Sequence, residues 1–242
     1  MNSSTHQLPN RAHGRHLFAP VSNIDRSVSH FGLIADGTRR WAQRRSISLP
    51  DAYILAVEKI ECLSAAVFEE GTEIFSIYLL SVDNLKRDLV SLDAALKAET
   101  YMLQDLLPRI AAQWNCRMVH AGAADLLPEA FQLHLSTLCA STNHYQERTM
   151  YLCAGYDPML EVAHAHEASL HNGLPLAANF WVPRPVDLIL RTGAVSRLSN
   201  FLPLQSGYAE LYFTTKLFPD TDSADIKRAY SYFNQCQRRH GL

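Results

Sequence analysis

Short apolar runs alternate with helical stretches along most of this chain, and this alternation constrains the fold more than any other feature. The runs have strand length and cover residues 31–35, 73–80, 117–120, 149–154, 186–190 and 211–214. Helical periodicity fills the stretches between them, at residues 50–70, 89–114, 128–147, 157–172 and 223–239. Strands that alternate with helices usually form parallel sheets covered on both faces. The sequence therefore predicts an α/β fold, a single domain with a mostly parallel central sheet flanked by helices.

The extent of the folded domain follows from composition. Residues 1–28 are rich in Ser, Asn, His and Pro and show no periodicity, so we expect a mobile N-terminal tail. Residues 29–242 should form one domain, because a chain of 242 residues that is 48% hydrophobic suits a single core. Within that domain, the helix at 157–172 should pack through Leu160, Ala163, His164 and Ala168.

Charge and cysteine content exclude several classes of protein. The formal net charge is −2, so no overall basic field favours nucleic acid or an anionic membrane surface. No apolar stretch approaches the ~18–20 residues that a membrane span needs, and no secretion signal is evident. The five cysteines show no metal-ligand spacing and indicate reduced thiols. We expect a cytoplasmic protein that binds any anionic ligand through local arginines.

Polar side chains follow the apolar run 31–35 directly. Asp36 stands where the strand should end, and ligands of open α/β sheets bind at that end of the strands. Gly37 lets the backbone pass close to a ligand, and Arg39 and Arg40 can hold phosphate oxygens with paired donors. Alone, an Asp-Gly pair is usually a turn and a lone arginine is usually solvated. Together they indicate a site for a phosphorylated ligand.

A second polar segment follows the apolar run 186–190. Arg191 begins it, and Arg197 and Ser199 add donors in the loop behind the strand. Glu210 is the obvious second carboxylate. Mg²⁺ prefers one or two carboxylates together with phosphate oxygens and water. These residues predict a magnesium-assisted reaction of diphosphates, with Asp36 and Glu210 as the metal ligands.

Five segments of the chain also match one known set of motifs. His30–Ala42 matches H-x-x-x-I-M-D-G-N-G-R-W-A, and residues 80–87 correspond to F-S-x-E-N-W-x-R. Residues 187–201 match D-L-x-I-R-T-x-G-E-x-R-x-S-N-F, and residues 208–213 match Y-x-E-L-Y-F. Arg239 and Gly241 fit a terminal R-x-G. These motifs, in this order, are those of the cis-prenyltransferases, the family that includes undecaprenyl diphosphate synthase, and the chain resembles it from about residue 30 onward.

The resemblance implies a cis-prenyltransferase catalytic domain over residues 29–242, with Mg²⁺ as cofactor and prenyl diphosphates as substrates. The donor diphosphate would be bound by Gly37, Thr38, Arg39, Arg40 and Arg87, and the acceptor diphosphate by Arg191, Arg197 and Ser199. In a homodimer, Arg239 and Gly241 would reach into the partner's acceptor site. Asp36 would act in catalysis through the metal, and the residues expected to assist proton removal are Ser81, Asp83 and Asn84. Further candidates for substrate contact are Trp41, Tyr53 and Leu85.

Departures from the family pattern concentrate around the expected diphosphate loops. Thr38 replaces an Asn, Arg39 replaces the small Gly that follows it, and Leu85 replaces the Trp of the middle motif. Tyr53 stands where chain-elongating members carry a His. The stretch D-G-x-R-R-W followed by this Tyr resembles the lavandulyl and cyclolavandulyl diphosphate synthases, which join dimethylallyl units head to middle. Tyr53 and Leu85 also have a plainer interpretation, as packing residues near the core.

Three functions therefore compete. The leading one is irregular coupling of dimethylallyl diphosphate with a second dimethylallyl or geranyl diphosphate, to a branched product that is cyclised or not. The second is ordinary chain elongation with isopentenyl diphosphate. The third is a catalytically silent partner subunit, against which the presence of Asp36, Glu210, Arg191 and Arg197 argues. The apolar stripe at 89–114 fits both a core and the wall of a prenyl pocket.

Overall fold

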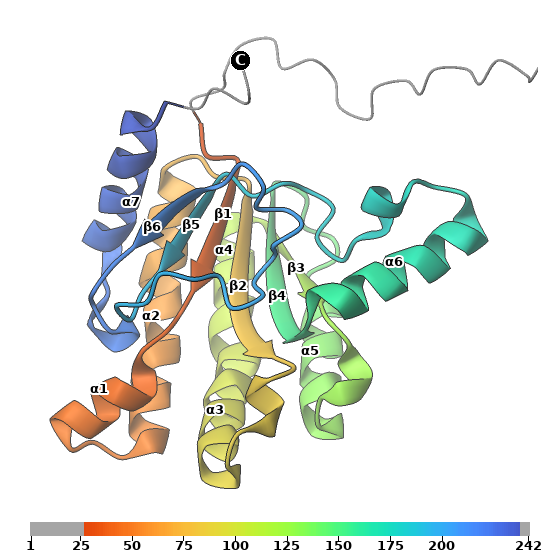
Figure 1. The fold of residues 1–242 in the computed structure, drawn as a ribbon. Coiled ribbons are helices and arrows are strands. Elements are labelled where there is room, and N and C mark those ends of the chain that lie inside the picture. The colour runs from red at the N-terminus through yellow and green to blue at the C-terminus, as the bar shows by residue number, and fades with distance from the viewer. Residues whose placement is uncertain (1–26, 238–242) are drawn as a thin grey trace, which may run out of the picture.

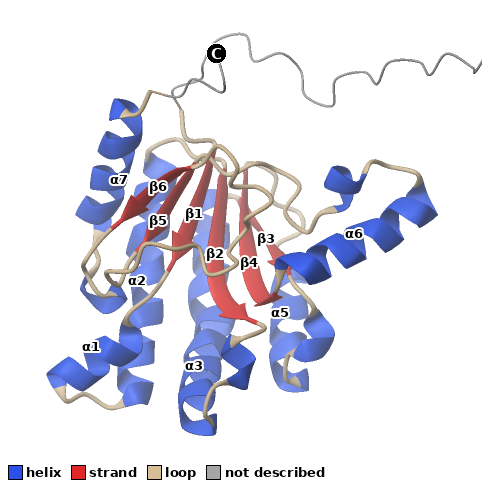
Figure 2. Cartoon of the chain, in the orientation of Figure 1, coloured by secondary structure: helices blue, strands red, loops and turns tan. Residues whose placement is uncertain are grey.

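A six-stranded, fully parallel sheet forms the centre of the molecule in the computed structural model, which describes residues 27–237 (Figures 1 and 2). The strand order is β3-β4-β2-β1-β5-β6. The strands are β1 (His30–Ile34), β2 (Ile74–Ser81), β3 (Cys116–Ala121), β4 (Arg148–Tyr156), β5 (Leu188–Arg191) and β6 (Glu210–Phe213). The predicted α/β fold with a parallel central sheet is confirmed.

Seven α-helices accompany the sheet within the described residues. They are α1 (Thr38–Arg45), α2 (Leu49–Glu69), α3 (Leu89–Tyr101), α4 (Leu107–Trp114), α5 (Glu129–Ser141), α6 (Pro158–Asn172) and α7 (Ser223–Gln235). A π-helical turn, Met102–Leu106, joins α3 to α4 and so divides the long helix predicted at 89–114. The predicted helix 128–147 ends early, at Ser141.

The two faces of the sheet are covered differently. Side chains from α2, α4, α5 and α7 pack on one face, in a core that includes Phe31, Leu63, Ile77 and Phe233. The other face is covered mainly by the long segment between α6 and β6, through residues such as Val182 and Phe201 (Figure 2). Helices therefore supply one cover and irregular chain supplies most of the other.

Helix α6 extends away from the sheet and does not pack as predicted (Figure 1). Of its residues only Glu161 and Ala165 are buried, whereas Leu160 is exposed. Glu161 accepts hydrogen bonds from the Tyr156 hydroxyl and the Val182 amide, which tie the helix to the segment beside it. The predicted face is only partly right: His164 stacks on Trp181 with ring centroids 5.4 Å apart, but Leu160 and Ala163 are exposed, and a buried carboxylate network anchors the helix.

Val28, which falls within the predicted tail, belongs to the core. Val28 is buried, and its carbonyl accepts a hydrogen bond from the Thr72 hydroxyl at 2.7 Å. Residues 1–26 of the predicted tail and residues 238–242 lie outside the described part of the chain. Between residues 27 and 237, no helix is long and apolar enough to cross a membrane.

Strand β1 is the point where the topology reverses, and this fixes the place of a ligand site. Its neighbours are β2 on one side and β5 on the other, with Ile34 in register with Tyr78 and with Arg191. The carboxyl ends of these three strands therefore meet. In open parallel sheets, ligands bind in the crevice at such a switch point.

Candidate active site

The turn that follows β1 is held by backbone and hydroxyl contacts around Asp36. The Thr192 hydroxyl accepts a hydrogen bond from the Asp36 amide at 2.9 Å and donates one to the Asp36 carbonyl at 2.7 Å. The Phe218 amide donates to the same carbonyl at 3.1 Å. Residues distant in sequence, from behind β5 and behind β6, thus fix the backbone of this aspartate.

The Asp36 carboxylate lies between two arginines. Arg40 Nη2 is 3.0 Å from Oδ1, and Arg191 Nη2 is 2.9 Å from Oδ2. Arg191 is buried, and its Nη1 also donates to the Ser199 hydroxyl at 2.9 Å and to the Arg197 carbonyl. Its Nε is buried without a hydrogen-bond partner in the described structure. The two predicted polar segments are therefore joined into one site, in which the Nε–H of Arg191 remains an unused hydrogen-bond donor within the described structure.

Gly193, which sequence reasoning did not single out, makes this arrangement possible. Its φ is +93°, and a Cβ built there would lie 2.7 Å from Arg40 Nη2 and 3.0 Å from the Asp36 carbonyl oxygen. Its own carbonyl accepts a hydrogen bond from Arg40 Nη1 at 2.7 Å. The position therefore requires a residue without a side chain, both for its conformation and for the close approach. Its place directly behind Arg191 and Thr192 was the available signal.

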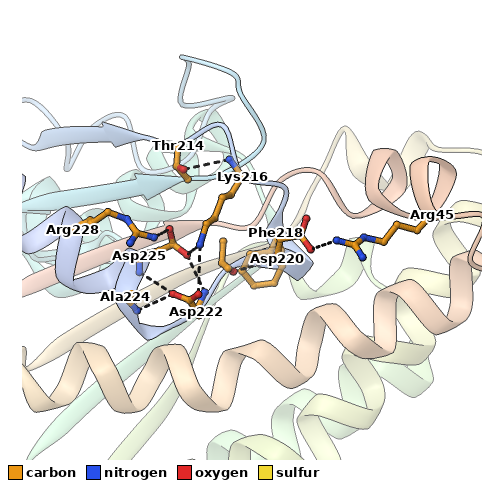
Figure 3. Close-up of polar contacts among 10 residues, drawn as sticks. Arg45, Thr214, Lys216, Phe218, Asp220, Asp222, Ala224, Asp225 and Arg228 are labelled. Atoms are coloured by element: carbon orange, nitrogen blue, oxygen red, sulfur yellow. Dashed lines mark hydrogen bonds and ion pairs between the residues drawn. The ribbon is translucent and has the colours of Figure 1, made fainter.

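A charged cluster supports the loop after β6 that contacts this turn (Figure 3). Lys216 Nζ lies 2.8 Å from Asp225 and 3.5 Å from Asp222, and Arg228 also pairs with Asp225. Burial alone would raise the pKa of Asp225, but the hydrogen bonds from Lys216 and Arg228 outweigh it and lower this pKa. The Lys216 carbonyl accepts a hydrogen bond from the Gly193 amide at 2.7 Å. The cluster thereby stabilises the backbone behind the site.

A cavity of about 500 Å³ opens at this edge of the sheet. Among residues 27–237, five arginines line it, against two carboxylates, Asp36 and Glu99. Apolar side chains from α2 and the strands line its remaining walls, among them Val57, Ile60 and Ile77. A net positive rim beside an apolar interior suits a ligand with an anionic head and a hydrocarbon tail.

The amino end of α1 adds backbone donors to the rim. Gly37 caps the helix in a left-handed conformation, and no side chain accepts a hydrogen bond from the first turn. A Cβ at Gly37 would lie 2.8 Å from the Leu217 side chain, so the capping residue has no room for one. Free amides at a helix start attract anions such as phosphate. The predicted diphosphate role of Gly37, Thr38, Arg39 and Arg40 is compatible with this placement.

Most of the predicted site residues are brought together. Those that line the cavity are Asp36, Gly37, Thr38, Arg39, Arg40, Tyr53, Ser81, Asn84, Arg87, Arg191, Arg197 and Ser199. They come from four separate stretches of the chain, residues 36–40, 53, 81–87 and 191–199. The apolar stripe predicted at 89–114 serves both purposes. It packs in the core, and its Met102 also lines the cavity beside Glu99 of α3.

Three residues predicted to contact the substrate or to assist proton removal lie outside the cavity. Trp41, on α1, is buried and donates a hydrogen bond from its indole N–H to Asp220 at 2.8 Å, so its role in this structure is structural. Asp83 is exposed and paired with Lys86 at 2.8 Å. Leu85 packs against the main core. None of the three lines the cavity. Arg239 and Gly241 lie outside the described residues.

The prediction that Glu210 shares a metal with Asp36 is not supported within one chain. Glu210 is the first residue of β6 and pairs with Leu188, at the amino end of β5. Asp36 follows the opposite end of the sheet, beyond the level of Arg191. With about 3.3 Å per strand residue, the two carboxylates are separated by roughly 15 Å along the strands. The apolar run 211–214 already placed Glu210 just before a strand, whereas Asp36 follows one, so a parallel sheet separates them.

Glu99 is a second residue that sequence reasoning missed. It lies on α3, is 7% exposed, and its Oε2 has no hydrogen-bond partner among the described residues. Burial raises the pKa of Glu99 to about 8, although the nearby Arg87 opposes the shift. A charged residue one helical turn after Leu96, within an otherwise apolar stripe, was the signal in the sequence.

The oxygen ligands at the cavity fit an Mg²⁺ ion that is coordinated mainly by the phosphate oxygens of a substrate and by one protein carboxylate. Across residues 27–237, no three His, Cys, Asp or Glu side chains gather into a metal cage. One carboxylate at a phosphate-binding rim is nevertheless enough, because Mg²⁺ usually combines one or two carboxylates with phosphate oxygens and water. Asp36, which is 30% exposed at its side chain, is the residue that would hold the ion.

Comparison with known proteins agrees with the geometry. A family model described as "Putative undecaprenyl diphosphate synthase" matches residues 34–241. Isoprenyl transferase 1 of Bradyrhizobium diazoefficiens is 30% identical over 220 residues, which cover 88% of this chain and 89% of the relative. Isoprenyl transferase 2 of Tropheryma whipplei is also 30% identical, over 100% of this chain and 98% of its own.

Two crystal structures share the fold. Lavandulyl diphosphate synthase from Lavandula x intermedia, in complex with dimethylallyl diphosphate, superimposes with a TM-score of 0.83 at 22% identity and covers 90% of this chain and 99% of its own. A probable undecaprenyl diphosphate synthase from Campylobacter jejuni gives a TM-score of 0.76 at 25% identity, over 89% and 99%. With a family model that spans most of its length and relatives that cover nearly all of it, the chain belongs to the undecaprenyl diphosphate synthase family and is a prenyltransferase.

Proposed function

We propose that this prenyltransferase couples dimethylallyl diphosphate head to middle with a second dimethylallyl or geranyl diphosphate, and that the product is a branched, lavandulyl-type diphosphate. One observation carries the proposal. Thr38, Arg39 and Tyr53, which depart from the chain-elongating pattern, all line the cavity. A change of substrate geometry is the consequence expected when several such positions change at one site. The likeness to lavandulyl diphosphate synthase concerns the fold, so the proposal rests on these residues.

The mechanism starts with loss of diphosphate from C1 of one allylic substrate, which leaves a delocalised cation. Arg39, Arg40 and Arg87 would bind the departing diphosphate, and Arg191 and Arg197 would bind that of the acceptor. Mg²⁺ held by Asp36 and the diphosphate would neutralise charge on the leaving group. The apolar walls exclude water, which would otherwise capture the cation. The π bond of the acceptor then attacks C1.

Two further parts of the proposal concern the assembled protein. A homodimer, in which Arg239 and Gly241 complete the partner's acceptor site, follows from the terminal motif. A cytoplasmic location follows from the composition. Sedimentation velocity of the full chain and of a chain ending at Gln237 tests the first. A loss of activity without a change of mass in the shortened chain would assign the terminal residues to the site rather than to assembly.

Chain elongation with isopentenyl diphosphate is the second candidate, and the names of the relatives favour it. Both curated proteins described above are called isoprenyl transferases. The silent-subunit alternative has no such support, because these relatives are enzymes and the cavity retains its arginines and Asp36.

A product assay with purified protein and Mg²⁺ separates the two candidates. One reaction receives dimethylallyl diphosphate alone, and another receives farnesyl and isopentenyl diphosphates; dephosphorylated products are identified by mass spectrometry. We expect a ten-carbon branched or cyclic alcohol from the first reaction. Longer linear products from the second reaction, with none from the first, would overturn the proposal and make this a chain-elongating enzyme.

A further inference from the structure

Glu99 is a carboxyl group that diphosphate binding does not use. It lies on α3, more than nine-tenths buried, and lines the same cavity as Asp36. Its Oε2 makes no hydrogen bond in the described structure. Buried polar atoms are nearly always paired, so an unpaired carboxylate oxygen at a ligand cavity indicates a functional role.

The surroundings of Glu99 differ from those of Asp36. Both oxygens of Asp36 accept hydrogen bonds from arginines. Glu99 has an apolar neighbour instead, Met102, which lies one turn later and is fully buried at the cavity wall. The charged and titratable groups that act on Glu99 are Arg87, in the loop before α3, and Tyr53, on α2. The π-helical turn and α5, which also pack near α3, add no group that shifts its ionisation in the described structure.

The proposed coupling requires a base in the apolar part of the cavity. The C1–O bond of one dimethylallyl diphosphate breaks, and its electron pair leaves on the diphosphate oxygen. The C2–C3 π pair of the second unit forms the new bond to C1, which leaves the positive charge on C3. The electron pair of a methyl C–H bond at C3 then forms a C=C bond, and a proton must leave. That methyl lies at the end of the short chain away from its diphosphate.

We propose that the Glu99 carboxylate accepts this methyl proton and is a catalytic residue of the coupling reaction. The inference rests on the proposed function, because head-to-middle coupling places the leaving proton at the hydrocarbon end. Of the two carboxylates that line the cavity among residues 27–237, Glu99 is the one with an oxygen that has no hydrogen-bond partner there. Solvent takes the proton once the product leaves.

The ionisation of Glu99 gives the proposal a signature in pH. Burial raises the pKa of Glu99 to about 8, so the carboxylate that serves as base is present above this pH and is lost below it. Wild-type kcat at saturating dimethylallyl diphosphate should therefore rise through pH 8 to a plateau. A carboxylic acid acting as proton donor would give the opposite slope.

The test compares wild type with Glu99→Gln and with Asp93→Asn, a matched control on the same helix. Asp93 is exposed and paired with Lys97. In Glu99→Gln, kcat should fall about 100-fold, as for loss of a general base, and the rise near pH 8 should disappear. Products that carry a tertiary alcohol, formed when water captures the C3 cation, should increase. Asp93→Asn should keep the wild-type pH profile.

Thermal unfolding shows, without any turnover, whether the buried carboxyl titrates. Because the pKa of Glu99 is raised in the folded state, this group lowers the stability as the pH rises from about 4.5 to about 8, and the loss is constant above that pH. Glu99→Gln should therefore unfold at a higher temperature than wild type at pH 9, and this difference should shrink at pH 5.

Two results would overturn the role of Glu99: an unchanged kcat and pH profile in Glu99→Gln, or a wild-type kcat that falls through pH 8. A wild type that couples only isopentenyl diphosphate would instead end the proposed function. Because that reaction releases its proton from C2 of isopentenyl diphosphate, beside the carbon that bears the diphosphate, this role of Glu99 would end with it, whereas a wild type active in head-to-middle coupling with an unaffected Glu99→Gln would overturn Glu99 alone.

Discussion

Asp36 shows how one carboxylate can serve binding and positioning together. Its two oxygens are held by Arg40 and Arg191, and its backbone is held by Thr192 and Phe218. These partners come from α1, β5 and the loop after β6. The side chain is therefore oriented before any ligand arrives, which lowers the entropic cost of aligning a substrate.

A substitution at Gly193 tests this positioning. In Gly193→Ala, the new Cβ would come within 2.7 Å of Arg40 Nη2, so Arg40 must move away from Asp36. We expect turnover to fall on the order of 100-fold, as for a small misplacement of a catalytic group. Steady-state kinetics at fixed Mg²⁺ measures the effect.

Gly71→Ala is the matched control for this variant. Gly71 has φ +88°, close to that of Gly193, but a Cβ there would meet nothing within 4 Å. Both variants should lose about 1–2 kcal/mol of stability, because a left-handed conformation is unfavourable for alanine. Equal turnover of the two variants would show that the contact with Arg40 does not matter.

At the scale of elements, the segment from β6 to α7 positions the site from outside it. Lys216, Asp222 and Asp225 fix the loop whose Leu217 packs against Gly37 (Figure 3). Asp225 also completes a capping box with Asp222 at the start of α7. The buried Asp225 carboxylate, with its two cationic partners, therefore links α7 to the turn that follows β1.

Asp225→Asn should destabilise the fold through this link. Asp225 is 1% exposed and accepts hydrogen bonds from Lys216, Arg228 and the Asp222 amide, and the loss of such charge-assisted hydrogen bonds costs about 1.5–3 kcal/mol of unfolding free energy. Since the pKa of Asp225 is lowered in the folded state, its contribution is present above about pH 4 and is lost as the pH falls below that value. Urea unfolding at pH 7 and pH 3 measures both effects.

An exposed carboxylate provides the comparison for Asp225. Asp93→Asn, which removes a surface pair with Lys97, should change the unfolding free energy little at either pH. If Asp225→Asn were as stable as wild type at pH 7, the cluster would not hold the loop in the way described.

The elements were predictable where a single local pattern decides them. Each strand lies within about two residues of an apolar run, because buried strands end where charge begins. The extent of helix α6 was predicted but its packing was not, because Glu161 anchors the helix through hydrogen bonds from Val182 and Gln205, which lie 21 and 44 residues further along the chain. Glu99 shows the same limit for the site: its place in the stripe was visible in the sequence, but its burial without a hydrogen-bond partner for Oε2 among the described residues depends on tertiary contacts.

For the whole molecule, the placement of charge explains how a weakly acidic chain binds anions. The net charge is −2, yet five arginines converge on one cavity at the switch point of the sheet. The topology brings together arginines that are more than 150 residues apart in sequence, such as Arg40 and Arg191. Local concentration of charge, rather than overall charge, makes this cavity suited to an anionic ligand.

The most direct test of this account is the Mg²⁺-dependent turnover of dimethylallyl diphosphate by Asp36→Asn, with Asp83→Asn as its control. Asp83 is an exposed aspartate paired only with Lys86 in the described structure, outside the cavity. We expect Asp36→Asn to lose about 1000-fold or more in kcat while remaining folded by circular dichroism, since it removes the single carboxylate available to the metal at the rim. Asp83→Asn should remain close to wild type. Near-normal turnover in Asp36→Asn would contradict the account.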